Sequence, residues 1–296
     1  MAGAAPVASG AVTLFDLGDV DDAAPAGAPS GPTVRIRLVV AYDGAPFHGF
    51  AANPGVRTVG ATLAAALGTV LGHVVELTCA GRTDKGVHAR AQVVTFATSA
   101  NALDLVGLCR SLNHMCGPAI AVTDAAVVAD DFDARFSATA RRYRYQVLNR
   151  AAPDPFLAPT AWHVDATLSM PAMVLACDAL IGEHDFSAFC RRPKRREGEP
   201  ASLVRRVTEA AWHDDGGGRL RFEIEASSFC HQMVRSVVGT LVDAGRGRLR
   251  PGDVLGIIRS RERRRAGDLA PPHGLMLWTV RYPGWSSGDH LDHLAA

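Results

Sequence analysis

The sequence predicts an α+β fold in which each half of the chain packs strands against helices. Short stretches rich in β-branched residues alternate with stretches whose apolar residues recur at helical spacing. Residues 151–159, which include three prolines, interrupt this pattern near the middle of the chain and favour a boundary there. Strands and helices then recur beyond the prolines, so we expect two subdomains with weak internal repetition.

The chain divides into four segments on these grounds. Residues 1–31 are rich in Ala, Gly and Pro and bury too little apolar surface to offset ordering entropy, so we expect a disordered tail. Residues 32–150 are expected to form an N-terminal subdomain and residues 151–283 a C-terminal one. Residues 284–296 are expected to be a second tail.

The expected elements of the first half follow from apolar periodicity and local signals. Thr58 is placed to cap a helix, and strict alternation puts Tyr143 and Tyr145 on one strand face, with Arg142 and Arg144 on the other. We expect strands at 34–41, 74–78, 92–98, 119–128 and 141–148, and helices at 58–71 and 103–112.

The second half contains a similar mixture. Two alternating stretches flank the glycine run Gly216–Gly218, which predicts a hairpin, and Pro251 begins a further helix. We expect helices at 170–181, 229–244 and 251–259, and strands at 204–212, 220–226 and 275–282.

The charge of the 296-residue chain is unevenly distributed. Its net charge is +1, but residues 1–32 hold four aspartates and no lysine or arginine, so the remainder carries 31 basic and 26 acidic side chains. Basic residues gather at 191–206 and at 259–265. Such patches suit the phosphates of a nucleic acid, although a solvated loop and a charged helix face account for charge runs equally well.

The six cysteines show neither a CxxC pair nor a spacing with histidine typical of a metal site. We therefore expect reduced core thiols and no structural metal. No apolar run is long enough to span a bilayer, and the N-terminus lacks the cationic start of a signal peptide, so we expect a cytoplasmic protein with no membrane partner.

The sequence GRTDKGVHA at 81–89 concentrates the candidate chemistry. Asp84 lies there between two expected strands, close to Arg82, Lys85 and His88. Neighbouring cations favour the ionised carboxylate, which suits a nucleophile or a stabiliser of positive charge better than a general acid. The ordinary alternative is an aspartate that only stabilises its own turn.

This loop, followed by QVVTF, resembles the signature of the pseudouridine synthases of the bacterial TruA family. Three further stretches match in the same order, namely AYDGAPFHGF at 41–50, DDFDARFSATARRYRY at 130–145 and SFCHQMVRSVVGTL at 228–241. The resemblance extends from about Val34 to Pro283. It implies a pseudouridine synthase fold, with two similar subdomains, mixed or antiparallel sheets flanked by helices, and a basic active-site cleft between them.

The resemblance also implies a reaction. Uridines at positions 38, 39 and 40 of the tRNA anticodon arm are converted into the carbon-linked isomer, pseudouridine, without a cofactor. A stacked base is out of reach, so the target nucleotide must be flipped out of its helix. By analogy with the family we expect a homodimer in which one tRNA touches both subunits.

Asp84 matches the catalytic aspartate of the family, and we expect it to act as the nucleophile. Attack on the ribose, addition to the uracil ring and removal of a proton from the sugar all remain open, and we favour the two routes that act on the sugar. Arg235 is expected to form a fork-shaped ion pair with Asp84, joining the two halves of the chain.

Other matched residues are expected to contact the substrate. Tyr143 is expected to stack on the uracil and to assist removal of the ring proton, with Tyr145 as the second choice. Arg82 is expected to fill the vacated stack or hold a phosphate, and Phe229 to pack under the base or within the core. Contacts with the RNA are also expected from Lys85 and His88.

Three residues depart from the usual family pattern. Phe50 stands where a tryptophan is common, Gly60 where a glutamine is common, and Lys85 where a small residue is common. They lie in stretches expected to contact RNA, so they bear on substrate preference more than on the chemistry.

Two other functions compete with this interpretation. A catalytically inactive tRNA-binding protein with the same fold would need only the strand tyrosines and the basic patches. A hydrolase using Asp84 with His88 is the other, but no serine elbow, HExxH helix or phosphate loop accompanies that pair. His290 and His293 in the tail are weak candidates for an adventitious metal.

Overall fold

The computed structural model describes residues 27, 31–99, 103–191 and 202–289. The expected N-terminal tail, apart from Gly27 and Gly31, lies outside these residues. Residues 192–201, which belong to the basic stretch at 191–206, also lie outside the described residues, as do His290 and His293.

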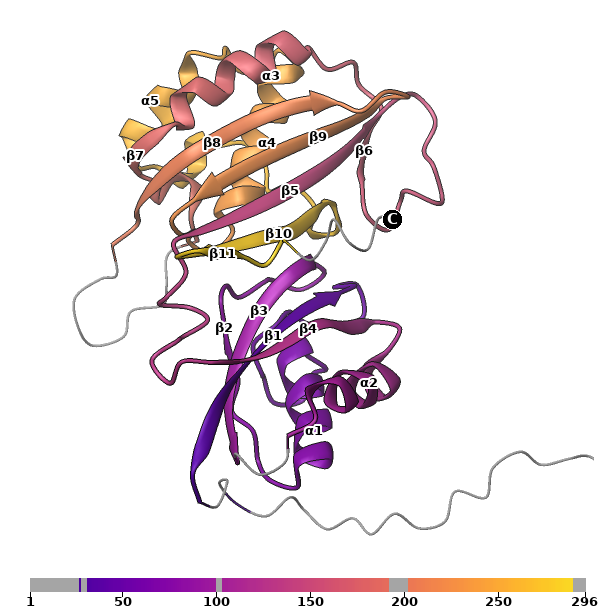
Figure 1. Ribbon diagram of the computed structural model, residues 1–296. Coiled ribbons are helices and arrows are strands. Elements are labelled where there is room, and N and C mark those ends of the chain that lie inside the picture. Colours follow the sequence, from indigo (N-terminus) through magenta and orange to yellow (C-terminus); the bar gives the residue numbers. More distant parts are fainter. Residues whose placement is uncertain (1–26, 28–30, 100–102, 192–201, 290–296) are drawn as a thin grey trace, which may run out of the picture.

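One mixed sheet extends through the described chain (Figure 1). Its main path runs in the order β4-β1-β3-β10-β5-β9-β8-β7, while β2 pairs with β3, β6 with β5 and β11 with β10. The strands are β1 (Thr33–Tyr42), β2 (Thr78–Cys79), β3 (His88–Ser99), β4 (Ile120–Val128), β5 (Ala140–Asn149), β6 (Trp162–Val164), β7 (Gly182–Asp185), β8 (Val204–Asp214), β9 (Arg219–Ala226), β10 (Leu275–Tyr282) and β11 (Trp285–Ser286).

The helices form two groups beside this sheet (Figure 1). The first group, α1 (Val59–Leu71) and α2 (Leu105–Cys116), lies beside the strands of the first half, and the second group, α3 (Met170–Cys177), α4 (Met233–Gly245) and α5 (Asp253–Ser260), lies beside those of the second. Thr58 caps α1 as expected, because its hydroxyl accepts the N–H of Ala61 at 3.3 Å. The α+β class predicted from the sequence is confirmed.

Strand β10 joins the two parts of the sheet. It pairs in parallel with β3 through Met276 and Leu277, and antiparallel with β5 along its other edge. A single cluster of buried hydrophobic side chains runs through both parts. The division into subdomains at residue 150 stays a prediction, since β5, from the first half, lies between β10 and β9, from the second.

Several expected elements differ in extent from the observed ones, and two of these differences bear on the site. The strand expected at 74–78 reduces to β2, which holds only Thr78 and Cys79. The helix expected to begin at Phe229 begins at Met233 instead, because Gln232 has a φ of 66° in the left-handed region and interrupts any continuous right-handed helix. Phe229 therefore lies in the loop that leads into α4.

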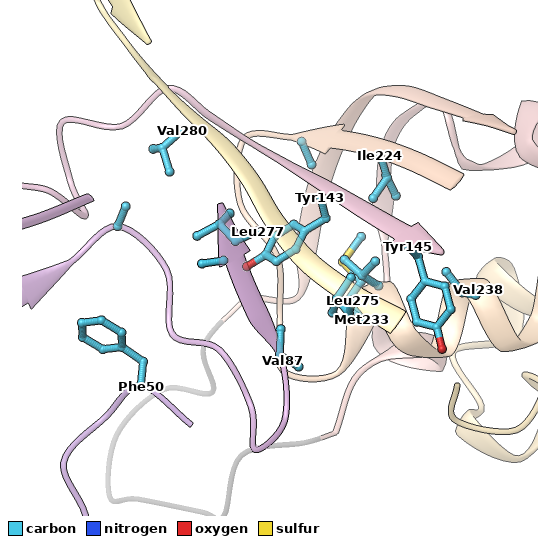
Figure 2. Close-up of a cluster of buried hydrophobic side chains, with 14 of the residues drawn as sticks. Phe50, Val87, Tyr143, Tyr145, Ile224, Met233, Val238, Leu275, Leu277 and Val280 are labelled. Carbon is cyan, nitrogen blue, oxygen red and sulfur yellow. The ribbon is translucent and has the colours of Figure 1, made fainter. Parts of the chain in front are cut away.

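The two faces of β5 carry different chemistry, as the alternation predicted. Figure 2 shows the rings of Tyr143 and Tyr145 within the buried cluster, where both side chains are inaccessible or nearly so. Arg142 faces the other way, and its guanidinium contacts Glu223 at 3.0 Å and Glu225 at 3.1 Å. These partly buried ion pairs hold β5 against β9.

The expectation of reduced thiols is wrong for one pair of cysteines. Cys190 and Cys230 form a disulfide, with Cα atoms 5.9 Å apart, a separation typical of such bonds. Their 40-residue separation in sequence follows no motif, so spacing alone could not reveal the pair. The other four cysteines are free thiols.

Candidate active site

The loop that carries Asp84 is a tight connection between β2 and β3. The backbone carbonyl of Asp84 accepts the N–H of Val87 at 3.1 Å, which closes a turn. Gly86 sits within this turn with a φ of 77°, a conformation that costs glycine little and other residues more. The turn therefore fixes the backbone of Asp84 at the junction of the two halves.

Buried polar side chains also hold this loop in place. Gln92, inaccessible on β3, donates from Nε2 to the carbonyl of Gly81 at 2.6 Å and accepts the N–H of Gly81 at 3.4 Å. Tyr42 and Thr83 are joined through their hydroxyls at 2.8 Å. Such a network is rigid when every member is satisfied, so it positions the loop precisely.

We expect Gln92→Leu to destabilise the protein, because it leaves both backbone groups of Gly81 without their partner in a buried environment. The free energy of unfolding should fall by about 1–3 kcal/mol. Urea unfolding followed by circular dichroism measures this change. The matched control is Gln146→Leu on β5, where the described structure gives no side-chain hydrogen bond, and equal stability of the two variants would contradict the assigned role.

Two side chains from the second half of the chain, an arginine and a histidine, reach the Asp84 carboxylate. Nη1 of Arg235 lies 3.6 Å from Oδ2, and Nε2 of His231 lies 3.1 Å from Oδ1. The Asp84 side chain is 27% exposed, against 11% for Arg235 and 49% for His231. Each oxygen of the carboxylate therefore has a protein partner, and the side chain is still accessible to a substrate.

Arg235 is itself anchored on α4. Its Nε donates to the carbonyl of Ala270 at 2.7 Å, and its own carbonyl accepts the N–H of Ala270 at 3.2 Å. Burial lowers the pKa of the Arg235 guanidinium, and the charge of Asp84 opposes that shift. The expected fork-shaped pair is not observed: Nη1 makes the contact with Asp84, and Nε donates to Ala270.

Tyr143 lies beside the carboxylate. Its ring packs edge-on against Phe229, with ring centroids 5.0 Å apart. Its hydroxyl lies close to Gly81, where a Cβ, if one were present, would be 3.6 Å from the hydroxyl oxygen. Burial raises the pKa of Tyr143, and the negative charge of Asp84 adds to the rise while Arg141 opposes it. The phenol therefore stays neutral at ordinary pH and acts as a hydrogen-bond donor rather than as a ready base.

The other expected site residues are distributed differently. Arg82 and Lys85 are exposed, and within the described chain their side chains have no ion-pair partner. His88 is buried, and its Nδ1 accepts the N–H of Gly44 at 3.1 Å, so it supports a neighbouring turn rather than facing a substrate. Tyr145 is fully buried, and its hydroxyl donates to the carbonyl of Pro271 at 2.8 Å.

The structure also adds residues that the sequence did not single out. His231, not His88, is the histidine that contacts Asp84, and its position beside the Arg235 motif was the available signal. Gln92 could have been noticed as an amide side chain at the start of a strand rich in β-branched residues. Ala270 offered no signal, because only its backbone takes part.

Metal and membrane sites were searched over the same described residues. No group of three or more His, Cys, Asp or Glu side chains there is arranged to hold a metal ion. None of the helices in that part of the chain is both long and apolar enough to cross a bilayer.

Comparison with known proteins identifies the class. The family model described as tRNA pseudouridine synthase matches residues 176–283, the segment that supplies His231, Arg235 and Ala270. Together with the α+β fold and the carboxylate-bearing loop, this match indicates a pseudouridine synthase, an isomerase that modifies tRNA.

Curated relatives narrow the assignment. Three proteins named tRNA pseudouridine synthase A are similar to 84% of this chain: one from Caulobacter sp. (strain K31) at 39% identity over 98% of its length, one from Leifsonia xyli subsp. xyli at 40% over 92%, and one from Bacillus subtilis at 37% over 99%. The chain belongs to the tRNA pseudouridine synthase A family. A solved Cbf5-Nop10-Gar1 complex aligns at a TM-score of 0.30 and 12% identity, too remote a likeness to add to this.

Proposed function

We propose that this enzyme converts uridines at positions 38, 39 and 40 of the tRNA anticodon arm into pseudouridine, with Asp84 as the essential group. The observation that carries the proposal is the accessible Asp84 carboxylate held between Arg235 and His231, next to Tyr143. These groups come from three separate stretches of the chain, which supports a site assembled for chemistry rather than a local turn.

The reaction is balanced without any other reactant. The bond between ribose C1′ and uracil N1 breaks, a bond between C1′ and C5 forms, the proton on C5 leaves, and N1 gains a proton. Atoms and electrons are conserved, so the proposed mechanism includes no cofactor.

In this scheme the Asp84 carboxylate acts on the nucleotide during cleavage of the C1′–N1 bond. Attack on C1′, abstraction of a sugar proton and addition to the ring are all compatible with one accessible oxygen, and we favour the routes that act on the sugar. Arg235 contacts the carboxylate and orients it. The neutral hydroxyl of Tyr143 supplies a hydrogen bond to the base.

The target base has to leave its stack to reach Asp84, at a cost of a few kcal/mol. Arg82 and Lys85 are exposed on the same loop, which supports contacts from them to the emptied stack or to phosphates. Phe229 packs against Tyr143 at the same point and supplies an apolar surface next to the base. His88 is not included, because its ring is buried away from Asp84.

Mapping of the product tests the proposal directly. Unmodified tRNA transcripts are incubated with the protein, and pseudouridines are located by their carbodiimide adducts. We expect adducts at whichever of positions 38, 39 and 40 carry uridine, and none in transcripts with cytidine at all three. Unmodified uridines in the anticodon arm after prolonged incubation would exclude this function and favour the inactive tRNA-binding protein.

The homodimer is part of the same proposal and rests on the family resemblance. Light scattering is expected to give twice the mass of the 31.3 kDa chain. If one tRNA contacts both subunits, a variant forced to be monomeric is expected to lose activity.

We expect His231 to act as a positioning residue for Asp84. His231→Ala removes the contact to Oδ1, so kcat should fall about tenfold, which is modest because the histidine is half exposed. KM should change little, since the substrate contacts are kept. His231→Gln retains a donor and should recover most of kcat, whereas equal losses in both variants would argue against orientation through this bond.

A further inference from the structure

A cavity of about 520 Å³ lies beside the candidate active site and is lined by arginines. Its walls are Ser187, Cys190 and Arg191 on one side and the segment Arg261–Arg264, which follows α5, on the other. None of these residues belongs to the site described above.

Positive charge exceeds negative charge around this cavity. The arginines that line it are Arg191, Arg261, Arg263 and Arg264, and the acidic residues that contact them are Asp185 and Glu262. Among the described residues this leaves a surplus of two positive charges.

The arginine side chains differ in how strongly other groups of the protein bind them. The side chain of Arg263 donates to the carbonyl of Gly267 at 3.1 Å and is fixed against the loop. Arg264 is 83% exposed and pairs with Glu262 at 2.9 Å, an exposed contact of the kind that contributes little and exchanges readily. Arg191 and Arg265 are exposed, and the described structure gives their guanidinium groups no ion-pair partner.

The backbone of the segment is held in a demanding conformation. Arg261 ends α5 with a φ of 57°, in the left-handed region that few non-glycine residues adopt. Its Nε pairs with Asp185 at 3.0 Å, which ties the segment to β7. Arg264 is thereby presented at the opening of the cavity.

A series of contacts through His231 joins the walls of this cavity to the Asp84 carboxylate. The N–H of Arg191 donates to the carbonyl of His231 at 3.0 Å, and Cys190 is bonded to Cys230. His231 in turn contacts Asp84 at 3.1 Å. A polynucleotide with one nucleotide at Asp84 therefore has this arginine-lined wall beside it.

We propose that this cavity binds backbone phosphates of the tRNA outside the flipped nucleotide. Guanidinium groups match phosphate oxygens in geometry and charge, and the unpaired arginines can exchange counterions for phosphates. The inference rests on the proposed function for the identity of the partner, and it assigns affinity rather than chemistry to this surface.

The test variant is Arg191→Gln/Arg264→Gln, and the control is Arg110→Gln/Arg248→Gln, which removes two exposed arginines from outside the cavity. Binding of unmodified tRNA is measured from about 50 to 200 mM NaCl, a range over which phosphate contacts change affinity strongly. Each lost phosphate contact lowers the slope of log Kd against log salt by roughly 0.7–0.9, so the test variant should lose about 1.5. We expect Kd to rise about tenfold at the lower salt, with kcat unchanged at saturating tRNA.

Two outcomes would overturn the inference. A slope and a Kd that match the control would show that phosphates do not occupy the cavity. A fall in kcat with unchanged Kd would assign the arginines to positioning the neighbouring loop. A failure of the proposed function is separate from both, because the wild-type protein would then form no pseudouridine although binding and its salt dependence remain measurable.

Discussion

Asp84→Asn is expected to abolish pseudouridine formation while leaving the fold and tRNA binding intact. The amide has the shape of the carboxylate and can still contact His231, but it carries no charge and is neither a nucleophile nor a base. Loss of a group that takes part in bond cleavage typically costs at least about 10⁴-fold in kcat. We expect a loss of that size under all three routes open to Asp84.

Single-turnover assays with saturating enzyme separate this chemical step from binding. The control is Asp165→Asn, an exposed aspartate on another part of the chain, which should retain full activity. Turnover by Asp84→Asn within about tenfold of the wild type would refute the catalytic role. Parallel loss of tRNA binding and activity would instead indicate that Asp84 maintains the structure of the loop.

The elements of the fold were largely predictable because periodicity is local. β10 was predicted with its exact bounds, and α1 with its Thr58 cap, since alternation and helical spacing are visible within ten residues. The order of the strands was not predictable. The parallel pairing of β10 with β3 involves residues nearly two hundred positions apart, and no local pattern encodes it.

The residues of the candidate site were likewise predictable in part, because their identity follows from local motifs and their contacts do not. Asp84, Tyr143 and Arg235 were found through matching motifs, and the structure brings Asp84 into contact with Arg235. The detail of that contact depends on tertiary structure, since Nε of Arg235 donates to the carbonyl of Ala270 and Nη1 is the nitrogen that contacts Asp84. The sequence indicates which polar groups are present, but not which of their hydrogen-bonding atoms are already bound to other parts of the protein.

Electrostatic inference from sequence neighbours was only partly successful. Four cations were expected around Asp84 from its own loop and α4, yet the groups that reach its oxygens are Arg235 and His231. Lys85 extends into solvent and His88 points into the core, because alternate residues of a strand or turn face opposite sides. Proximity in sequence is therefore a poor guide to the charges that a carboxylate experiences.

Arg235→Gln should produce the second largest loss. Its removal leaves Asp84 without its least exposed cationic partner and leaves the carbonyl of Ala270 without its donor. We expect kcat to fall about 10²–10³-fold, because the carboxylate loses its orientation, and the free energy of unfolding to fall by about 1–3 kcal/mol. Arg235→Lys should recover little activity, since one ammonium group cannot match the two separate directions served by Nε and Nη1.

The combination of the two variants tests whether Arg235 acts through Asp84. In Asp84→Asn the reaction already lacks its essential group, so adding Arg235→Gln should cause almost no further loss of kcat, whereas the loss of stability that comes from the Ala270 contact should persist. Single-turnover rates and urea unfolding of the four proteins measure both quantities. If the double variant instead loses the product of the two single effects, Arg235 contacts the substrate independently, and its assignment as the anchor of the carboxylate is wrong.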